Sequence, residues 1–353
     1  MTLACSRPLG RFLDRFLAAL ALCAGATLSP AWAGLGMTRL PASGDDGPVT
    51  VFYPSDAAER PVWAGWQPVP LATDAPPAAG NGRLVVLSHG SGGTPWVHLD
   101  LARRLTEAGF VVALPQHRGD HAGDPGTPGP ESWSRRPGEV RRAIDAVLAD
   151  GRWPGLDARR VGLWGLSAGG HTALELAGGR WSPARFAEHC RQHIAEDFAA
   201  CVGLYAELTG GPLDGLKRWL APRALDSRFG SDTTWRHERD ERIAAVVAVV
   251  PLAADFDPAS LQRPAVPLGL VNAAQDRWLL PAWHGLRVLQ GCTGCEDLAT
   301  LPDGGHGAML SPPPPVGGLA GRLLADPPGF DRAATVPAVE QRTVAFFQRH
   351  LLR

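Results

Sequence analysis

The sequence predicts an α/β protein with a doubly wound, mostly parallel β-sheet. Short apolar runs recur along the chain, amphipathic segments of helical period separate them, and glycines close several of those segments. Apolar runs without alternation are typical of strands that are buried on both faces of a sheet. Helices between such strands would cover the two faces, which is the doubly wound arrangement.

The first half of the chain carries the most regular pattern. One strand is predicted at 48–54, followed by a proline- and tryptophan-bearing loop over 55–81. Further elements then alternate: strands at 83–90, 110–115 and 160–165, and helices at 98–109 and 137–151. A helix is also expected after 170, closed by Gly178 and Gly179.

The regular pattern stops after this helix and returns near residue 242. The stretch at about 180–241 contains helical fragments, tryptophans and two cysteines. An insertion of this size between core elements usually caps a site or forms one of its walls. Strands at 242–251, 266–276 and 297–302 and an amphipathic helix at 336–352 complete the pattern. We therefore expect one domain over 34–353 with an insertion at about 180–241.

Residues 1–33 have the features of an export signal. Three arginines precede an apolar run from Phe16 to Leu28, and SPAWA supplies a small-x-small cleavage site ending at Ala33. The apolar run of 13 residues is shorter than the ~20 that cross a bilayer, so no stable membrane insertion is expected. Cleavage near Ala33 would export the remaining chain to the periplasm or the exterior.

Composition and cysteine usage narrow the class of protein. The chain of 353 residues is 45% hydrophobic, with a formal net charge of −1 and no strongly basic block, so no nucleic acid is expected as a partner. Cleavage would leave four cysteines, which predicts two disulfides and allows three pairings: Cys190, Cys201, Cys292 and Cys295. Cys190 and Cys201 cannot pair within one continuous helix, because 11 residues separate them by ~16 Å. If they pair, the chain folds back between them.

The segment GLSAGG, residues 165–170, places Ser167 between glycines where a predicted strand meets a predicted helix. A serine at such a turn is lifted out of the sheet as a nucleophile. Sites of doubly wound sheets lie at the carboxyl ends of strands, and Asp276 and His306 also follow predicted strands. An imidazole oriented by a carboxylate can take the proton of a serine hydroxyl. Ser167, His306 and Asp276 are therefore predicted to form a catalytic triad.

An acyl-transfer site also needs N–H donors for the oxyanion of its transition state. One donor is expected from Ala168, directly after the serine, and the other from Ser91 in SHGSGG, which follows an early strand. This chemistry needs no metal and no organic cofactor, so neither is expected. The expected substrate is a small-molecule or lipid-like ester, and the sequence does not give the oligomeric state.

Together with Asp276 and GGHG at 304–307, the motifs VVLSHGSGG and GLSAGG resemble the α/β-hydrolase family. The likeness is strongest to a secreted branch similar to predicted dienelactone hydrolases, and distantly to platelet-activating-factor acetylhydrolases; SRRPGEVRRAIDAVL matches the same branch. It spans roughly 49–352 and implies a serine esterase. Dienelactone hydrolases carry a cysteine nucleophile where this chain has Ser167, so lactone substrates are not implied. In the acetylhydrolases the acid follows the preceding strand, which makes Asp255 or Asp257 an alternative to Asp276.

Other histidines permit different interpretations. His171, four residues after Ser167, is expected to pack or to line a pocket, and His89 is expected to brace the oxyanion loop. Two histidine pairs have the i, i+4 spacing of a helical metal site: His117 with His121, and His189 with His193. Because neither carries the H-E-x-x-H signature, a polar strand-end loop and a solvated helix face are expected there instead.

Two further questions stay open in the sequence. Trp63, Trp66 and Trp96 either line an acyl pocket or anchor the loops that carry them. A peptidase or amidase with the same triad, and a hydrolase-like binding protein without activity, are the alternatives to an esterase.

Overall fold

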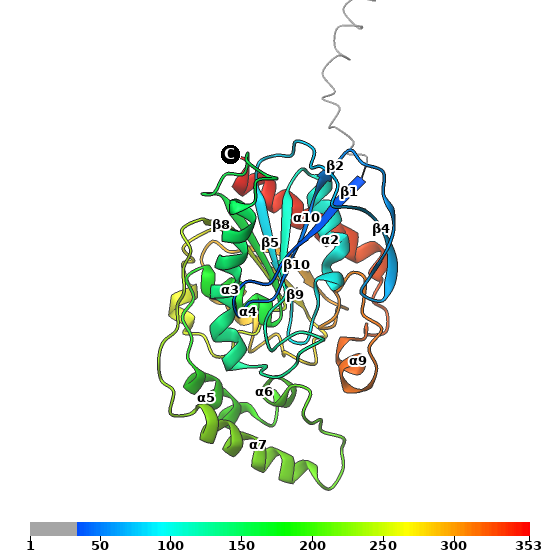
Figure 1. Ribbon diagram of the computed structural model, residues 1–353. Coiled ribbons are helices and arrows are strands. Elements are labelled where there is room, and N and C mark those ends of the chain that lie inside the picture. The colour runs from blue at the N-terminus through cyan, green and yellow to red at the C-terminus, as the bar shows by residue number, and fades with distance from the viewer. Residues whose placement is uncertain (1–33) are drawn as a thin grey trace, which may run out of the picture. The chain divides into compact units, whose positions relative to one another are not determined.

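The computed structural model describes residues 34–353, and the predicted export signal over 1–33 lies outside the described residues (Figure 1). A ten-stranded sheet forms the centre of the described chain, in the order β10-β9-β8-β7-β5-β6-β2-β1-β4-β3. Six consecutive members of this order pair in parallel. They are β5 (Leu84–Ser88), β6 (Val111–Pro115), β7 (Val161–Leu166), β8 (Ile243–Val249), β9 (Leu268–Ala273) and β10 (Glu296–Leu301). The predicted doubly wound, mostly parallel sheet is confirmed.

The N-terminal part of the sheet differs from the prediction. It holds β1 (Gly34–Leu40), β2 (Val49–Ser55), β3 (Arg60–Ala64) and β4 (Gln67–Thr73), of which only β2 was expected. The prediction of a loop over 55–81 is wrong, because β3 and β4 pair antiparallel within it, with Pro61 opposite Pro70. Pro61 is tolerated because β3 is the edge strand, where an N–H that faces away from the sheet has no partner to lose.

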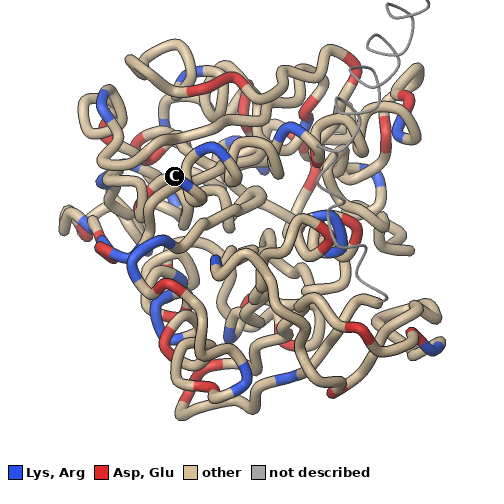
Figure 2. Tube along the Cα trace, turned by 90° about the horizontal axis from the view of Figure 1, so that it is seen from above, with Lys and Arg blue, Asp and Glu red and all other residues tan. Residues whose placement is uncertain are grey.

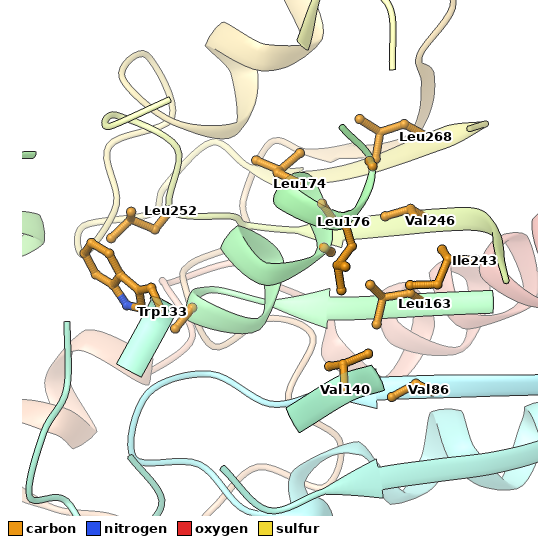
Figure 3. Packing of buried hydrophobic residues seen from close by; sticks show 14 of the residues in the cluster. Val86, Trp133, Val140, Leu163, Leu174, Leu176, Ile243, Val246, Leu252 and Leu268 are labelled. Carbon is orange, nitrogen blue, oxygen red and sulfur yellow. The ribbon is translucent and has the colours of Figure 1, made fainter. Parts of the chain in front are cut away.

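Helices cover both faces of the sheet (Figure 1). On one face lie α2 (Leu99–Glu107) and α10 (Arg332–Leu351), and on the other lie α3 (Pro130–Ala149), α4 (Ala168–Leu176) and α8 (Gly285–Gly291). Figure 3 shows Leu174 and Leu176 of α4 packed near Leu163 of β7 and Val246 of β8. Full burial of one such side chain stabilises the fold by about 1.5–3 kcal/mol, so this packing fixes α4 on the sheet.

Residues 180–241 form a helical region beside α4. It contains α5 (Pro183–His193), α6 (Phe198–Val202) and α7 (Asp214–Phe229). A disulfide joins Cys190 to Cys201 across the turn between α5 and α6, with 5.6 Å between their Cα atoms. The chain thus folds back between these cysteines, as their pairing requires. The second disulfide, Cys292 to Cys295, follows α8.

The remaining elements are short: the 3-10 helices η1 (Pro95–His98) and η2 (Pro258–Leu261), and helix α9 (Gly318–Leu324). Within residues 34–353 there is no helix that combines the length and the apolar character needed to cross a membrane. Figure 2 shows that acidic and basic residues are interleaved along the described chain.

A buried glutamate joins the two helices of the α2/α10 face and makes stability depend on pH. Glu340 of α10 is 2% exposed, and its Oε2 accepts a hydrogen bond of 2.6 Å from Arg104 Nε. Burial outweighs the influence of Arg104 and raises the pKa of Glu340 to about 7. The folded chain therefore binds this proton more tightly than the unfolded chain does, and the free energy of unfolding falls as pH rises from about 4.5 to about 7.

We expect Glu340→Gln to remove about 2–3 kcal/mol of this pH dependence. Glutamine keeps an oxygen for Arg104 but carries no titrating proton. The measurement is urea unfolding of wild type and variant at pH 5 and pH 8. The same exchange at exposed Glu107 of α2 is the control, and identical pH dependence in wild type and Glu340→Gln contradicts the prediction.

Candidate active site

Ser167 lies on a sharp turn between the end of β7 and the start of α4. Its φ of 57° and ψ of −114° belong to a region that non-glycine residues rarely adopt. The backbone is held there from two sides: Ser167 N–H donates to Val249 O over 3.0 Å, and Leu252 N–H donates to Ser167 O over 3.3 Å. Strain of this kind persists where the surroundings enforce it, and it concentrates at functional sites.

The glycines around Ser167 are required by close backbone contacts. A Cβ at Gly165 would lie 2.0 Å from Gly169 O, and a Cβ at Gly169 would lie 1.9 Å from Ser88 O. Real Cβ atoms do not approach backbone oxygens so closely. The turn therefore packs directly onto the end of β5, where the predicted oxyanion loop begins.

The structure brings Ser167, His306 and Asp276 into one hydrogen-bonded chain. Ser167 Oγ lies 3.0 Å from His306 Nε2, and His306 Nδ1 lies 2.7 Å from Asp276 Oδ2. The other carboxylate oxygen of Asp276 accepts the N–H groups of Trp278 and Leu279 over 2.8 and 2.9 Å, which fixes the carboxylate. His306 and Asp276 are buried, at 2% and 3% exposed. This arrangement can take the hydroxyl proton of Ser167 onto an oriented imidazole.

The alternative acids lie elsewhere. Asp255 is fully buried and bonds His171 Nε2 over 3.0 Å. Asp257 accepts the N–H of Ala259 at the start of η2 and pairs with Arg180. Neither carboxylate contacts His306, so Asp276 is the acid beside it. His171 itself packs among aromatic rings, as expected: Trp133, Trp181 and Phe256.

Sequence reasoning missed Trp278, which lies beside His306. Its ring lies 5.0 Å from that of His306, tilted by 46°. The only signal was its place two residues after Asp276. Of the three tryptophans singled out instead, Trp63 is 73% exposed on the edge strand β3, while Trp66 and Trp96 pack against the core on the α2/α10 face. The anchoring interpretation fits Trp66 and Trp96.

The loop after β5 lies against the serine. A Cβ at Gly90 would be 3.3 Å from Ser167 Cβ. His89 Nδ1 bonds Gly90 O over 2.8 Å, and burial holds the pKa of His89 well below its usual range, so the ring is neutral. Among residues 34–353, the N–H groups of Ser91 and Ala168 have no hydrogen-bond acceptor. Both are thus available to a substrate oxygen, and Ala168 lies at the positive end of α4.

One cluster in the described chain has side chains that could hold a metal ion: His189, Asp197 and His284. The two histidines each place Nε2 2.9 Å from Asp197 Oδ2. His284 Nδ1, however, accepts the N–H of Ala253 over 3.0 Å. Its proton must then sit on Nε2 and point at Asp197, which leaves no lone pair there for a metal. The donor set therefore does not fit a metal ion.

The same cluster joins the helical region to the site. Burial opposes ionisation of Asp197, but hydrogen bonds from the two histidines outweigh it and lower the pKa of Asp197 to about 2. Asp197 Oδ1 also accepts the N–H of Leu280 over 3.4 Å, on the loop that carries Asp276. The expectation of a solvated helix face is wrong for His189, which is only 6% exposed because it makes this contact. His117, in the other pair, is fully buried.

Comparison with known proteins gives a family and a similar solved structure for this chain. A family model described as Alpha/beta hydrolase family matches residues 85–316. The solved structure of a ferulic acid esterase from Streptomyces cinnamoneus is similar with a TM-score of 0.58 and 19% sequence identity, covering 90% of each chain. At that identity the likeness shows the fold alone. No curated protein matches this sequence.

Proposed function

The chain belongs to the α/β-hydrolase family, and on that premise we propose that it is an exported serine hydrolase that cleaves carboxylic esters through an acyl-enzyme. The observation that carries the proposal is the chain of hydrogen bonds from Ser167 Oγ through His306 to Asp276. A serine hydroxyl is a weak nucleophile, and an oriented imidazole is the group that activates it.

In the proposed acylation, Ser167 Oγ attacks the ester carbonyl carbon while its proton moves to His306 Nε2. Asp276 holds the imidazole by its Nδ1–H and stabilises the imidazolium. The N–H groups of Ser91 and Ala168 bind the oxyanion of the tetrahedral intermediate. The intermediate collapses, the ester C–O bond breaks, and the alcohol leaves with the proton from His306.

Deacylation repeats the sequence with water. His306 takes a proton from the water that attacks the acyl carbon, and returns it to Ser167 Oγ as the carboxylic acid leaves. Each step uses side chains and backbone N–H groups of this chain, and no cofactor is part of the proposal. Strain at Ser167 serves this chemistry because it holds Oγ beside His306 before a substrate arrives.

Esters are the proposed substrates rather than amides because the fold neighbour is titled an esterase. The finer likeness, to the secreted dienelactone hydrolase-like branch and to the acetylhydrolases, stays a prediction. So does the division into an export signal over 1–33 and a catalytic domain over 34–353 with its insertion. Two disulfides are compatible with export, since they persist in oxidising compartments.

The test is hydrolysis of p-nitrophenyl esters from acetyl to palmitoyl, with a feruloyl ester added because of the fold neighbour. We expect turnover that varies with acyl length, and labelling of Ser167 by a fluorophosphonate probe. Ser227→Ala, at an exposed serine of α7, is the matched control for Ser167→Ala. Labelling of Ser167 without ester turnover would direct the search to amides and peptides. Absence of labelling would favour a binding protein.

A further inference from the structure

We propose that the buried ion pair of Asp120 and Arg136 is a positioning device for the oxyanion loop, defined here as residues 89–92. The pair touches no substrate; it fixes the two peptide planes that flank the Ser91 N–H, the donor proposed to face the developing oxyanion. This inference rests on the proposed function and adds two residues to its machinery.

Both side chains are removed from water. Arg136, on α3, is fully buried and Asp120, in the loop after β6, is 1% exposed, with 2.8 Å between Nη2 and Oδ2. Arg136 Nε donates to Ser132 Oγ over 3.0 Å, and Nη1 donates to His89 O. Asp120 Oδ2 accepts from Ser91 Oγ over 3.1 Å. Burying such a pair is costly and often adds little stability, so its bonds to one loop indicate a role in the conformation of that loop.

The two charged groups act on the two outer peptide planes of the loop, on either side of the plane between Gly90 and Ser91. In a trans peptide the C=O and the following N–H point in opposite directions. Arg136 Nη1 binds His89 O, so the N–H of Gly90 faces away from Arg136. Asp120 Oδ1 accepts the N–H of Gly92 over 3.1 Å, which fixes the plane between Ser91 and Gly92. The guanidinium and the carboxylate thus hold the loop from both ends.

The central plane, between Gly90 and Ser91, is fixed by His89. Gly90 O accepts from His89 Nδ1 over 2.8 Å and from Gly93 N–H over 3.1 Å, so the Ser91 N–H points the other way. The tautomer of His89 is also determined, because its Nε2 accepts the N–H of His117 over 3.3 Å and Nδ1 must then carry the proton. The predicted bracing role of His89 thereby gains a mechanism.

His117 is held in turn by a second chain of groups that resembles a triad. Its Nε2 lies 2.8 Å from Ser88 Oγ, and its Nδ1 contacts Glu139 Oε2. Ser88 and His117 are fully buried, so this chain has no access to substrate. Ser88 directly precedes the loop and the N–H of His117 binds His89 Nε2, so this chain of groups supports the loop from its buried side, as Asp120 and Arg136 do.

The test compares Arg136→Met, Arg136→Lys and Asp120→Asn with wild type on the best p-nitrophenyl ester. We expect kcat to fall by about 10- to 100-fold in Arg136→Met, with KM changed by less than about twofold. A misdirected N–H donor weakens the hydrogen bond to the oxyanion of the transition state and leaves substrate binding unchanged. Affinity for a trifluoromethyl ketone, whose oxyanion occupies the same place, should fall by the same factor as kcat/KM. Arg136→Lys should be intermediate, since one ammonium cannot serve both His89 O and Asp120.

Titration with fluorophosphonate counts folded active sites and separates a positioning effect from loss of folded protein. Glu340→Gln, which alters the Arg104–Glu340 contact on the opposite face, is the control and should leave kcat unchanged. If the wild type hydrolyses the ester and kcat per titrated site is unchanged in Arg136→Met and Asp120→Asn, the inference is overturned while the proposed function stands. The inference is also overturned if a variant loses affinity for the trifluoromethyl ketone by the same factor as KM for the ester rises. A wild type that hydrolyses no ester overturns both.

Discussion

Replacement of Ser167 by alanine is expected to lower kcat for ester hydrolysis by about 10⁴- to 10⁶-fold while the fold is retained. Alanine removes the oxygen that forms the acyl-enzyme, and nothing else near His306 Nε2 replaces it at 3.0 Å. The neighbours that hold the turn bind the backbone of residue 167 rather than its side chain. Steady-state kinetics, with urea unfolding of the same preparations, measures both parts of the prediction.

The three residues of the triad act as a unit, so the losses of kcat in single variants should not multiply in a double variant. We expect the double variant Ser167→Ala, His306→Ala to lose little more than Ser167→Ala alone. Asp276→Asn should lower kcat by about 10⁴-fold, because an amide that donates toward Nδ1 favours the wrong tautomer of His306. Asp255→Asn and Asp257→Asn are the matched controls, and a loss at either as large as at Asp276 would contradict the assignment of the acid.

The part of the fold that was predicted correctly is the part whose packing leaves a local pattern. Strands buried on both faces must be apolar throughout, and β5 to β9 are buried along nearly their whole length. The strands β3 and β4 do not meet this requirement. Most positions of β3 are exposed, only part of β4 is buried, and prolines occupy exposed positions of both, so the segment had the composition of a loop.

In the candidate site, too, the residues predicted correctly are those that follow a local pattern. Ser167, Asp276 and His306 follow strand patterns, and the topology of a parallel sheet brings such positions to one edge. Arg136 and Asp120 are 16 residues apart, and Arg136 contacts His89 47 residues away. No periodicity marks a side chain that binds a distant carbonyl. Asp197, which binds His284 87 residues away as well as His189 of its own region, was missed for the same reason.

Gly169 offers a second large effect, this time on stability. The residue lies in the first turn of α4, where alanine is normally preferred to glycine by up to about 1 kcal/mol. At this position the sign should reverse, because an added Cβ would lie 1.9 Å from Ser88 O, at the buried end of β5. Backbone on both sides leaves little room to relax. We expect Gly169→Ala to reduce the free energy of unfolding by about 2–3 kcal/mol, the upper part of the usual range for overpacking.

Gly215 of α7 is the matched control for Gly169→Ala. It is also helical, but a Cβ there would meet nothing within 4 Å, so Gly215→Ala should stabilise the chain slightly. Urea unfolding of the two variants isolates the effect of space from that of helix propensity. Because Ser88 directly precedes the oxyanion loop, its displacement should also lower kcat in Gly169→Ala. If both variants are equally stable, the turn and β5 are less closely packed than these contacts require, and the glycine after Ser167 needs another explanation.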